Sequence, residues 1–366
     1  MWIFRVKRPS GSPPVFKVSY VARGFSQRQG VDFFQTFSPT LKMTTLRVLL
    51  HVAAQRDYEL HSLNFSKTFL QVSLHEEIWL RRPPGFTGSF LAGTQWSLRG
   101  PVYGVCQAPH EWKDTLRMML AALGFAPSTA DPSLFLRPDT SLPLLYILVY
   151  LGLQITRDRA SRTIILTESN MVHQVLQRFG FRYSSPQSTP LPTGQSLSAP
   201  PLDESVEPSG PYPELVGCLI HRPEHWEAAK RVLRYLCTTS GMGLLLGGRG
   251  LVVLTGHSDA YWVDDMAVQR SSQGYTFSLG FDSVTWQSTC SSSILSSSYE
   301  AEIYDGAMAA QELRWLTYLL TDLGEQPRSP PVLYVDNKAM ITLCQKHRLE
   351  HRTKHIALRY FLAREL

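Results

Sequence analysis

A proline-rich segment divides this sequence of 366 residues into two parts. Eight prolines lie between Ser184 and Pro213, among serines, glycines and acidic residues. Proline lacks a backbone N–H donor and interrupts helices and strand ladders, so the segment predicts a linker. A chain of this length is expected to form two or three domains, each with its own core. We therefore expect a domain boundary in this segment.

Composition and charge indicate a folded protein with an affinity for phosphate. Hydrophobic residues make up 43% of the chain and charged residues 18%, a balance typical of packed globular domains rather than disordered ones. There are 36 basic and 30 acidic residues, which gives a net charge of +6. Of the basic residues 27 are arginines, whose guanidinium groups bind phosphate with two parallel hydrogen bonds. On charge alone, the solvated faces of ordinary domains explain these residues as well as a nucleic acid partner does.

The cysteines and the apolar segments predict an intracellular protein. The five cysteines are far apart and never form a C-x-x-C pair, so neither a disulfide framework nor a cysteine zinc site is expected. The N-terminus has no apolar core of signal-peptide length. The longest apolar run, Leu142 to Leu153, is well short of the roughly 20 residues that a spanning helix needs. We expect no membrane partner, and the cytoplasm and the nucleus remain equal alternatives.

Apolar spacing predicts an α+β fold. Before the linker, extended and helical patterns alternate; the extended ones are Phe16 to Arg23 and Glu77 to Leu80, and the helical ones are Thr44 to Gln55 and Glu111 to Leu123. After it, a helix is expected at His225 to Leu236 and another at Ser298 to Leu323. Four strands are expected at Leu251 to His257, Gly274 to Leu279, Val284 to Gln287 and Val332 to Val335. The second part therefore predicts a compact unit with a mixed sheet.

Several motifs in the first part carry a specific family resemblance. They are, in order, Tyr20–Gln27 (YVARGFSQ), Gly30–Pro39 (GVDFFQTFSP), Phe69–Gln71 (FLQ), Pro83–Phe86 (PPGF) and Tyr103–Pro109 (YGVCQAP) with Trp112. This order of motifs resembles the reverse transcriptase of Ty1/copia-type retrotransposons. The resemblance implies a truncated reverse transcriptase domain with fingers and palm at residues 1–183, and a Pro-rich linker and connection remnant at 184–249.

Motifs in the second part resemble the RNase H of the same polyprotein. They are Ser258–Ala260 (SDA), Gln269–Tyr275 (QRSSQGY), Ser297–Glu302 (SSYEAE), Leu313–Leu316 (LRWL), Tyr334–Asn337 (YVDN) and Arg352–Ile356 (RTKHI). The resemblance implies an RNase H-like mixed-sheet α/β domain at residues 250–366. It extends over nearly the whole chain.

The polymerase site that the family implies is missing from the sequence. A polymerase palm needs one Asp on a strand and an Asp pair on a neighbouring hairpin to hold two Mg²⁺ ions. The first Asp of the family falls at Asn64, which is neutral. The apolar strand Leu145 to Tyr150 runs directly into Leu151 to Ile155, with no Tyr-Val-Asp-Asp hairpin between them. A similar tetrapeptide, Trp262 to Asp265, lies after the linker, where it has no polymerase meaning. We therefore expect polymerase activity to be lost.

The RNase H site that the family implies is partly retained. Its catalytic and metal-binding carboxylates correspond to Asp259, Glu302 and Asp336, and hydrolysis of RNA would use Mg²⁺ held by them. Without the resemblance, it would be equally plausible that these three residues are ordinary surface acids at strand ends and at a helix N-terminus. A fourth acid of many relatives is replaced by Ala357, which would weaken one metal position. Asp305 is expected to be solvated, whereas Trp286 and Trp315 are expected to anchor the core.

These features lead to three functional hypotheses for a degenerate fragment. The first is residual Mg²⁺-dependent cleavage of RNA in RNA·DNA hybrids, and the second is binding of a hybrid or a template-primer without catalysis. The third is an inert, decayed product. For the binding hypothesis the candidate contacts are basic residues near both ends of the chain. They are Arg23, Lys42, Arg47, Arg352, Lys354 and His355. No small-molecule cofactor is expected.

Overall fold

The structure is a computed structural model, and the described residues form two compact units. It describes residues 1–7, 13–38, 41–63, 65, 68–83, 85, 95–137, 145–147, 154–192, 223–250, 252–265, 270–290, 298–325, 327, 329–336 and 341. The first unit comprises Met1–Leu41 and His61–Leu148, and the second comprises Lys42–Leu60 and Val149–Leu366. The second unit thus includes a segment from the N-terminal part of the chain. The domain ranges 1–183, 184–249 and 250–366 remain a prediction.

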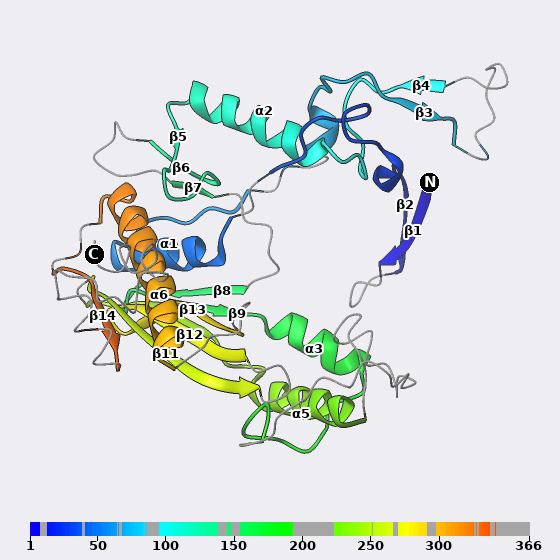
Figure 1. Ribbon diagram of the computed structural model, residues 1–366. Helices are drawn as coiled ribbons and strands as arrows, with labels where there is room; N and C mark the ends of the chain where they lie inside the picture. Colours follow the sequence, from blue (N-terminus) through cyan, green and yellow to red (C-terminus); the bar gives the residue numbers. More distant parts are fainter. Residues whose placement is uncertain are drawn as a thin grey trace. The chain divides into compact units, whose positions relative to one another are not determined.

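The first unit consists of small antiparallel sheets and one long helix (Figure 1). Strands β1 (Trp2–Lys7) and β2 (Val15–Tyr20) form a hairpin, and β3 (Trp79–Arg81) pairs with β4 (Gln95–Ser97). Strands β5 (Ala126–Pro127), β6 (Leu134–Leu136) and β7 (Leu145–Ile147) form a third sheet in that order. Helix α2 (Ala108–Ala122) provides the centre of a buried cluster of Val72, Trp112, Leu116, Leu120, Phe125 and Phe135. Two 3₁₀ turns occupy Gly24–Ser26 and Thr68–Gln71.

A four-stranded mixed sheet dominates the second unit. Strands β11 (Leu254–Asp265), β12 (Arg270–Leu279) and β13 (Asp282–Cys290) form an antiparallel meander, and β14 (Val332–Val335) pairs parallel to β11. The strand order is β13-β12-β11-β14, and the long helix α6 (Ser298–Asp322) packs on the sheet. Buried side chains of α6 and of the strands fill the space between them. They include Leu313, Leu316, Leu320, Leu254, Phe277 and Val284.

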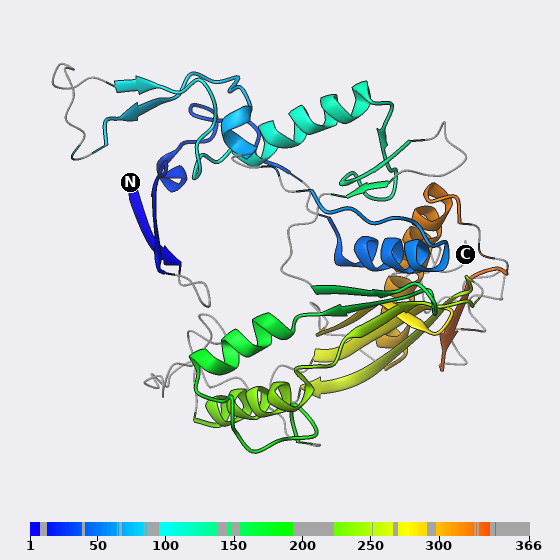
Figure 2. The ribbon, with the colours of Figure 1, turned by 180° about the vertical axis from the view of Figure 1, so that it is seen from behind.

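A second, smaller sheet in this unit carries three further helices. Strands β8 (Gln154–Asp158), β9 (Thr163–Thr167) and β10 (Leu244–Gly247) pair in the order β10-β9-β8. Helices α3 (Ser169–Arg178) and α5 (Pro223–Thr239) pack against each other. Helix α1 (Met43–Gln55) packs on β9, β10 and β13, and in both ribbon views it lies beside strand β9 (Figures 1 and 2).

Several expectations from the sequence can be compared with the described elements. Each helix and strand expected from apolar spacing has a counterpart that overlaps it, and the mixture of helices and sheets confirms the α+β class. The tetrapeptide Trp262 to Asp265 lies at the end of strand β11. The assignment of Trp286 to the core was wrong, since 51% of it is exposed. Trp315 is half-buried. None of the described helices is long and apolar enough to cross a membrane.

The contact between Gly256 and Phe277 gives a test of the main sheet. A Cβ atom on Gly256 would lie 2.2 Å from the Phe277 ring, which is fully buried. We expect Gly256→Ala to lower the free energy of unfolding by about 1–3 kcal/mol, because overpacking a dense core forces neighbouring atoms to move. Gly250→Ala is the matched control, since a Cβ there meets nothing within 4 Å. Urea titration followed by hydrogen exchange at the β12 amides measures both, and equal midpoints would contradict the expectation.

Candidate functional site

Two of the predicted RNase H carboxylates lie at neighbouring positions of the mixed sheet. Ser258 of β11 is the register partner of Val335 of β14, and Asp259 and Asp336 each follow directly. The strands are parallel, so the same step along each one brings both aspartates to adjacent places. Both side chains are exposed. Two neighbouring, accessible carboxylates form the kind of oxygen-ligand pair that Mg²⁺ binds.

The face of the sheet that carries these aspartates also carries a pair of stacked rings. His257 and Tyr334 are register partners two residues earlier, and their ring centroids are 5.0 Å apart. Side chains alternate along a strand, so His257 and Asp259 lie on one face and Ser258 on the other. The opposite face packs on α6, because Ser258 pairs with Tyr275, which lines a cavity beneath that helix. Strand alternation therefore directs Asp259 away from α6.

The third predicted carboxylate, Glu302, lies on α6, four residues after the helix begins. Its side chain is outside the described part of the chain, and the strand register alone does not bring it to the two aspartates. Among the described side chains there is no cluster of three or more His, Cys, Asp or Glu groups that could hold a metal ion. The structure thus places two members of the predicted site next to each other. The third remains a prediction.

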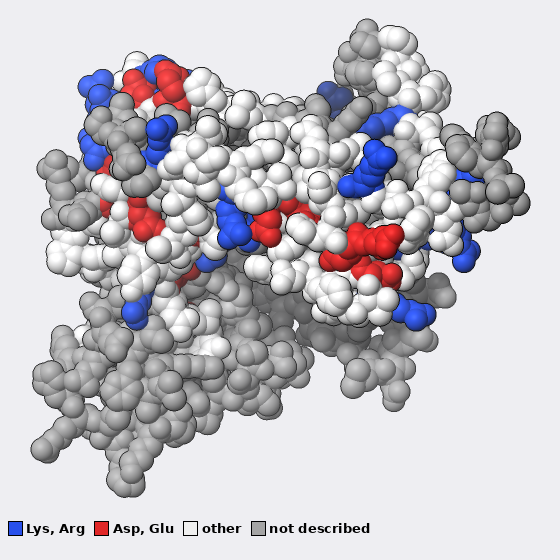
Figure 3. Space-filling model, turned by 90° about the horizontal axis from the view of Figure 1, so that it is seen from above, with Lys and Arg blue, Asp and Glu red and all other residues white. Residues whose placement is uncertain are grey.

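The predicted nucleic-acid contacts are distributed between the two units. Arg23 is exposed beside the first 3₁₀ turn of the first unit, whereas Lys42 and Arg47 belong to the second. Arg352, Lys354 and His355, as well as Asn64, lie outside the described residues. On the face drawn in Figure 3, Lys and Arg side chains lie next to Asp and Glu side chains, and the described residues there form no continuous basic band. Charge on that face does not mark a nucleic-acid track.

Two of these cations contact aromatic rings of the second unit. The Nζ atom of Lys42 lies 3.9 Å from the Trp315 ring centroid, and the Arg47 guanidinium carbon lies 4.0 Å from that of Trp286. Arg47 also donates to the Val284 carbonyl oxygen at 3.4 Å, and burial lowers the pKa of its guanidinium. Contact with a phosphate would have to compete with these interactions. Both cations therefore contribute to packing within the unit.

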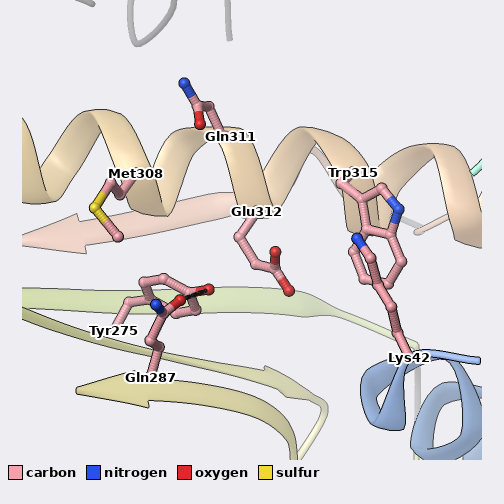
Figure 4. A pocket seen from close by; sticks show the side chains of 7 residues that line it. All are labelled: Lys42, Tyr275, Gln287, Met308, Gln311, Glu312 and Trp315. Carbon is pink, nitrogen blue, oxygen red and sulfur yellow. Dashed lines mark hydrogen bonds between the residues drawn. The ribbon is translucent and has the colours of Figure 1, made fainter. Parts of the chain in front are cut away.

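A cavity of about 330 Å³ lies where the start of α1 meets α6 and strands β12 and β13 (Figure 4). Its walls are Lys42, Tyr275, Gln287, Met308, Gln311, Glu312 and Trp315. Glu312 points from α6 toward the strands, where its Oε1 accepts a hydrogen bond from Thr285 Oγ1 at 3.5 Å. Tyr275 donates its hydroxyl proton to Gln287 Oε1 at 2.6 Å. Among the described side chains, neither Asp259 nor Asp336 lines this cavity.

Burial changes the protonation of the groups around this cavity. It raises the pKa of Glu312, an effect that Lys42 and the Thr285 hydrogen bond oppose. Burial, with the charges of Glu312 and Asp305, raises the pKa of Tyr275 to about 12, so the phenol stays a donor at neutral pH. Asp305 itself is buried, with 1% exposed, so the expectation that it is solvated was wrong. Its position on α6 faces the sheet, which a single-helix projection of the sequence did not reveal.

Comparison with known proteins shows which proteins the chain is similar to. Residues 1–151 match the reverse transcriptase (RNA-dependent DNA polymerase) family. The chain is 32% identical to the retrovirus-related Pol polyprotein from transposon RE2 of Arabidopsis thaliana, over 99% of this chain and 29% of that protein. It is 29% identical to the corresponding polyprotein from transposon TNT 1-94 of Nicotiana tabacum, over 100% of this chain and 32% of that protein. No solved structure is significantly similar.

These alignments also describe how much of the polyprotein is present. The alignment with the RE2 polyprotein extends over 420 residues, which is 54 more than the 366 residues of this chain. The chain spans less than a third of the length of each of these relatives. The reverse transcriptase match and the similarity along nearly the whole chain make it similar to one part of the Pol polyproteins of Ty1/copia-type retrotransposons.

Proposed function

We propose that this chain is a degenerate Pol fragment that no longer polymerises DNA and that cleaves the RNA strand of RNA·DNA hybrids with Mg²⁺. The observation that carries the proposal is the neighbouring position of Asp259, on β11, and Asp336, which directly follows the parallel strand β14. The mixed strand order, with a parallel fourth strand and a helix packed on the sheet, supports an RNase H-like unit. The similarity to these Pol polyproteins supports a nucleic acid as the substrate.

Loss of polymerisation is supported by the chemistry of the sequence. Asn64 is neutral and cannot supply the first carboxylate, and no Asp pair follows the apolar run Leu145 to Tyr150 in the sequence. Two Mg²⁺ ions cannot be held for phosphoryl transfer without these charges. The 54 additional residues of the RE2 alignment are consistent with missing internal segments, of which the palm hairpin would be one.

The donor set fits a divalent cation at the RNase H-like site. Asp259 and Asp336 would hold Mg²⁺ through their carboxylate oxygens, which are the ligands this ion prefers. When bound, the ion would supply an activated water and stabilise the leaving oxygen of the RNA strand. The two aspartates concentrate negative charge on an exposed face, so they attract a cation but repel a phosphate that approaches without one. The proposed activity is therefore expected to depend on the metal.

The test is cleavage of a labelled RNA·DNA hybrid by the full chain in Mg²⁺, with Asp259→Asn prepared in parallel. We expect at least a roughly 100-fold loss of cleavage in Asp259→Asn, because loss of even an outer-shell partner costs up to about 100-fold. Asp265→Asn is the matched control, since Asp265 ends the same strand and is outside the predicted site. Chelation of the metal should abolish cleavage.

Two outcomes would contradict the proposal. One is equal cleavage by Asp259→Asn and the unchanged chain. The other is the absence of cleavage by a chain whose β11 and β12 amides are protected from hydrogen exchange. If such a chain still bound the hybrid, with an affinity that falls steeply with salt and does not change in Asp259→Asn, binding without catalysis would replace the proposal.

A further inference from the structure

We propose that residues 42–60, a segment of the reverse transcriptase match, form an indispensable part of the second unit, which is stable only when they are docked on it. The docking surface consists of strands β9, β10 and β13 and the residues that follow α6. The RNase H-like half is then a discontinuous unit whose core includes a helix of the other half. This inference does not depend on the proposed cleavage activity.

Helix α1 makes an extensive apolar contact with the rest of the second unit. Nine of the 13 residues of α1 are buried, and Val48 and Leu49 are 0% and 2% exposed. Near the end of the helix Ala54 meets Gly247 of β10, where an added Cβ would lie 2.5 Å from the Ala54 Cβ. Such close approach requires both small residues, since a larger side chain at either position would push the helix off the strand. The interface is packed like a core.

A buried polar cluster joins the middle of α1 to two strands. His51 Nδ1 lies 2.8 Å from Asp282 Oδ2, and the Gly247 N–H donates to the same oxygen at 2.6 Å. A carboxylate only accepts hydrogen bonds, so His51 Nδ1 carries the proton. His51 is 1% exposed and Asp282 is 9% exposed. The hydrogen bond between His51 and Asp282 is made only while α1 is docked, because undocking would remove this donor from a buried carboxylate.

The residues that follow α1 form ion pairs with other parts of the second unit. Arg56 donates through Nε and Nη2 to the two carboxylate oxygens of Glu325, each at 2.7 Å, and Glu325 is buried. Arg157 of β8 donates to Asp57 Oδ1 and to the Tyr58 carbonyl oxygen, both at 2.6 Å. Two-point contacts of a guanidinium fix direction as well as distance. The segment is therefore oriented by Arg157 of β8 and by Glu325, which follows α6.

The aromatic contacts at the start of α1 complete the attachment. Lys42 stacks on Trp315 of α6 and Arg47 on Trp286 of β13, while Thr44 Oγ1 donates to Thr285 Oγ1 at 3.0 Å. Contacts along the whole segment thus involve β8, β10, β13, α6 and the turn after α6. A fragment that begins after residue 60 would expose this entire surface to water. Exposure of a packed apolar surface of this kind is expected to destabilise the strands beneath it.

The test is hydrogen exchange on the full chain with Leu49→Ala. We expect exchange to become at least about 30-fold faster at the amides of β9, β10 and β13, since a buried Leu→Ala change costs about 2–5 kcal/mol and 1.4 kcal/mol is tenfold. The amides of α2, in the first unit, should keep their protection. Leu49→Met, which preserves volume, should change exchange in these strands by no more than about threefold.

A reciprocal variant shows whether the effect is specific. Leu116→Ala removes a buried side chain of α2, and it should accelerate exchange around α2 while β9, β10 and β13 stay protected. The proposal is overturned if Leu49→Ala accelerates exchange only within α1 and leaves the three strands unchanged. It is also overturned if Leu49→Ala and Leu116→Ala accelerate exchange equally in both units, because the chain would then unfold as one body. Neither result bears on cleavage, so the two proposals fail separately.

Discussion

Primer extension by the full chain is expected to remain at the background of a reaction without enzyme. The reason is the loss of charge at the polymerase position, where two Mg²⁺ ions need at least three carboxylates. Asn64 supplies none, and the apolar run Leu145 to Tyr150 continues in the sequence into Leu151 without an Asp pair. Because metal-assisted phosphoryl transfer depends almost entirely on positioning and charge stabilisation, their loss is expected to remove all measurable extension. A labelled primer on an RNA template, with dNTPs and Mg²⁺, measures the result.

Restoring a single charge should not rescue this activity. Asn64→Asp returns one carboxylate of the three, so its primer extension is also expected to stay at background. An active reverse transcriptase on the same template-primer serves as the positive control for the assay. Extension that requires both dNTPs and Mg²⁺, by the unchanged chain or by Asn64→Asp alone, would show that the polymerase interpretation of these residues is wrong.

The helices and strands of the second unit were largely predictable because their patterns are local. The strand Val332–Val335 was predicted with the bounds that the structure gives it, since four apolar residues follow a proline cluster. The long helix was predicted from Ser298 to Leu323 and is observed to Asp322, where Gly324, at φ 72°, ends it. Family motifs then directed attention to Asp259 and Asp336, whose adjacency depends on the parallel pairing of β11 and β14.

The contacts between elements that are far apart in the sequence could not be predicted in the same way. The apolar spacing of Thr44 to Gln55 predicts a helix with a buried face, but it does not say which strands cover that face. The sequence assigned this helix to the first domain, whereas the structure places it in the second unit. Trp286 looked like a core residue because it lies among apolar strand neighbours, yet it forms an exposed platform for Arg47. These relations are decided by residues that are far apart in the sequence.

The importance of Asp282 is a second feature that sequence reasoning missed. It follows Gly280 and Phe281 in the tight connection between β12 and β13, where an acidic residue is typical of an exposed turn. In the structure one of its oxygens accepts hydrogen bonds from His51 and from the Gly247 N–H. A histidine on the apolar face of a helix was the available signal, since a buried imidazole needs a partner. The sequence around His51 does not show which residue is the partner, because Asp282 lies 231 residues away.

Asp282→Ala is expected to destabilise the second unit by about 2–5 kcal/mol. The change leaves two buried donors, His51 Nδ1–H and the Gly247 N–H, without their acceptor, and each unsatisfied group costs about 1–3 kcal/mol. Asp282→Asn keeps an oxygen at the same place, so its loss of stability should be smaller. Hydrogen exchange at the β10 amides, followed in increasing urea, measures both variants. A double-mutant cycle with His51→Phe then separates the shared hydrogen bond from the rest.

The same cycle shows whether His51 and Asp282 stabilise the unit through their shared hydrogen bond or through independent packing. If the shared hydrogen bond stabilises the unit, the double variant His51→Phe, Asp282→Ala loses clearly less stability than the sum of the two single variants, as measured at the β10 amides. The reason is that each change removes the same contact. Additive effects would mean that the two residues stabilise the unit independently, and an Asp282→Ala chain within about 0.5 kcal/mol of the original would mean that water replaces the lost acceptor. Either outcome would assign the docking of α1 to its apolar face alone, with Val48, Leu49 and Ala54 as its main contacts.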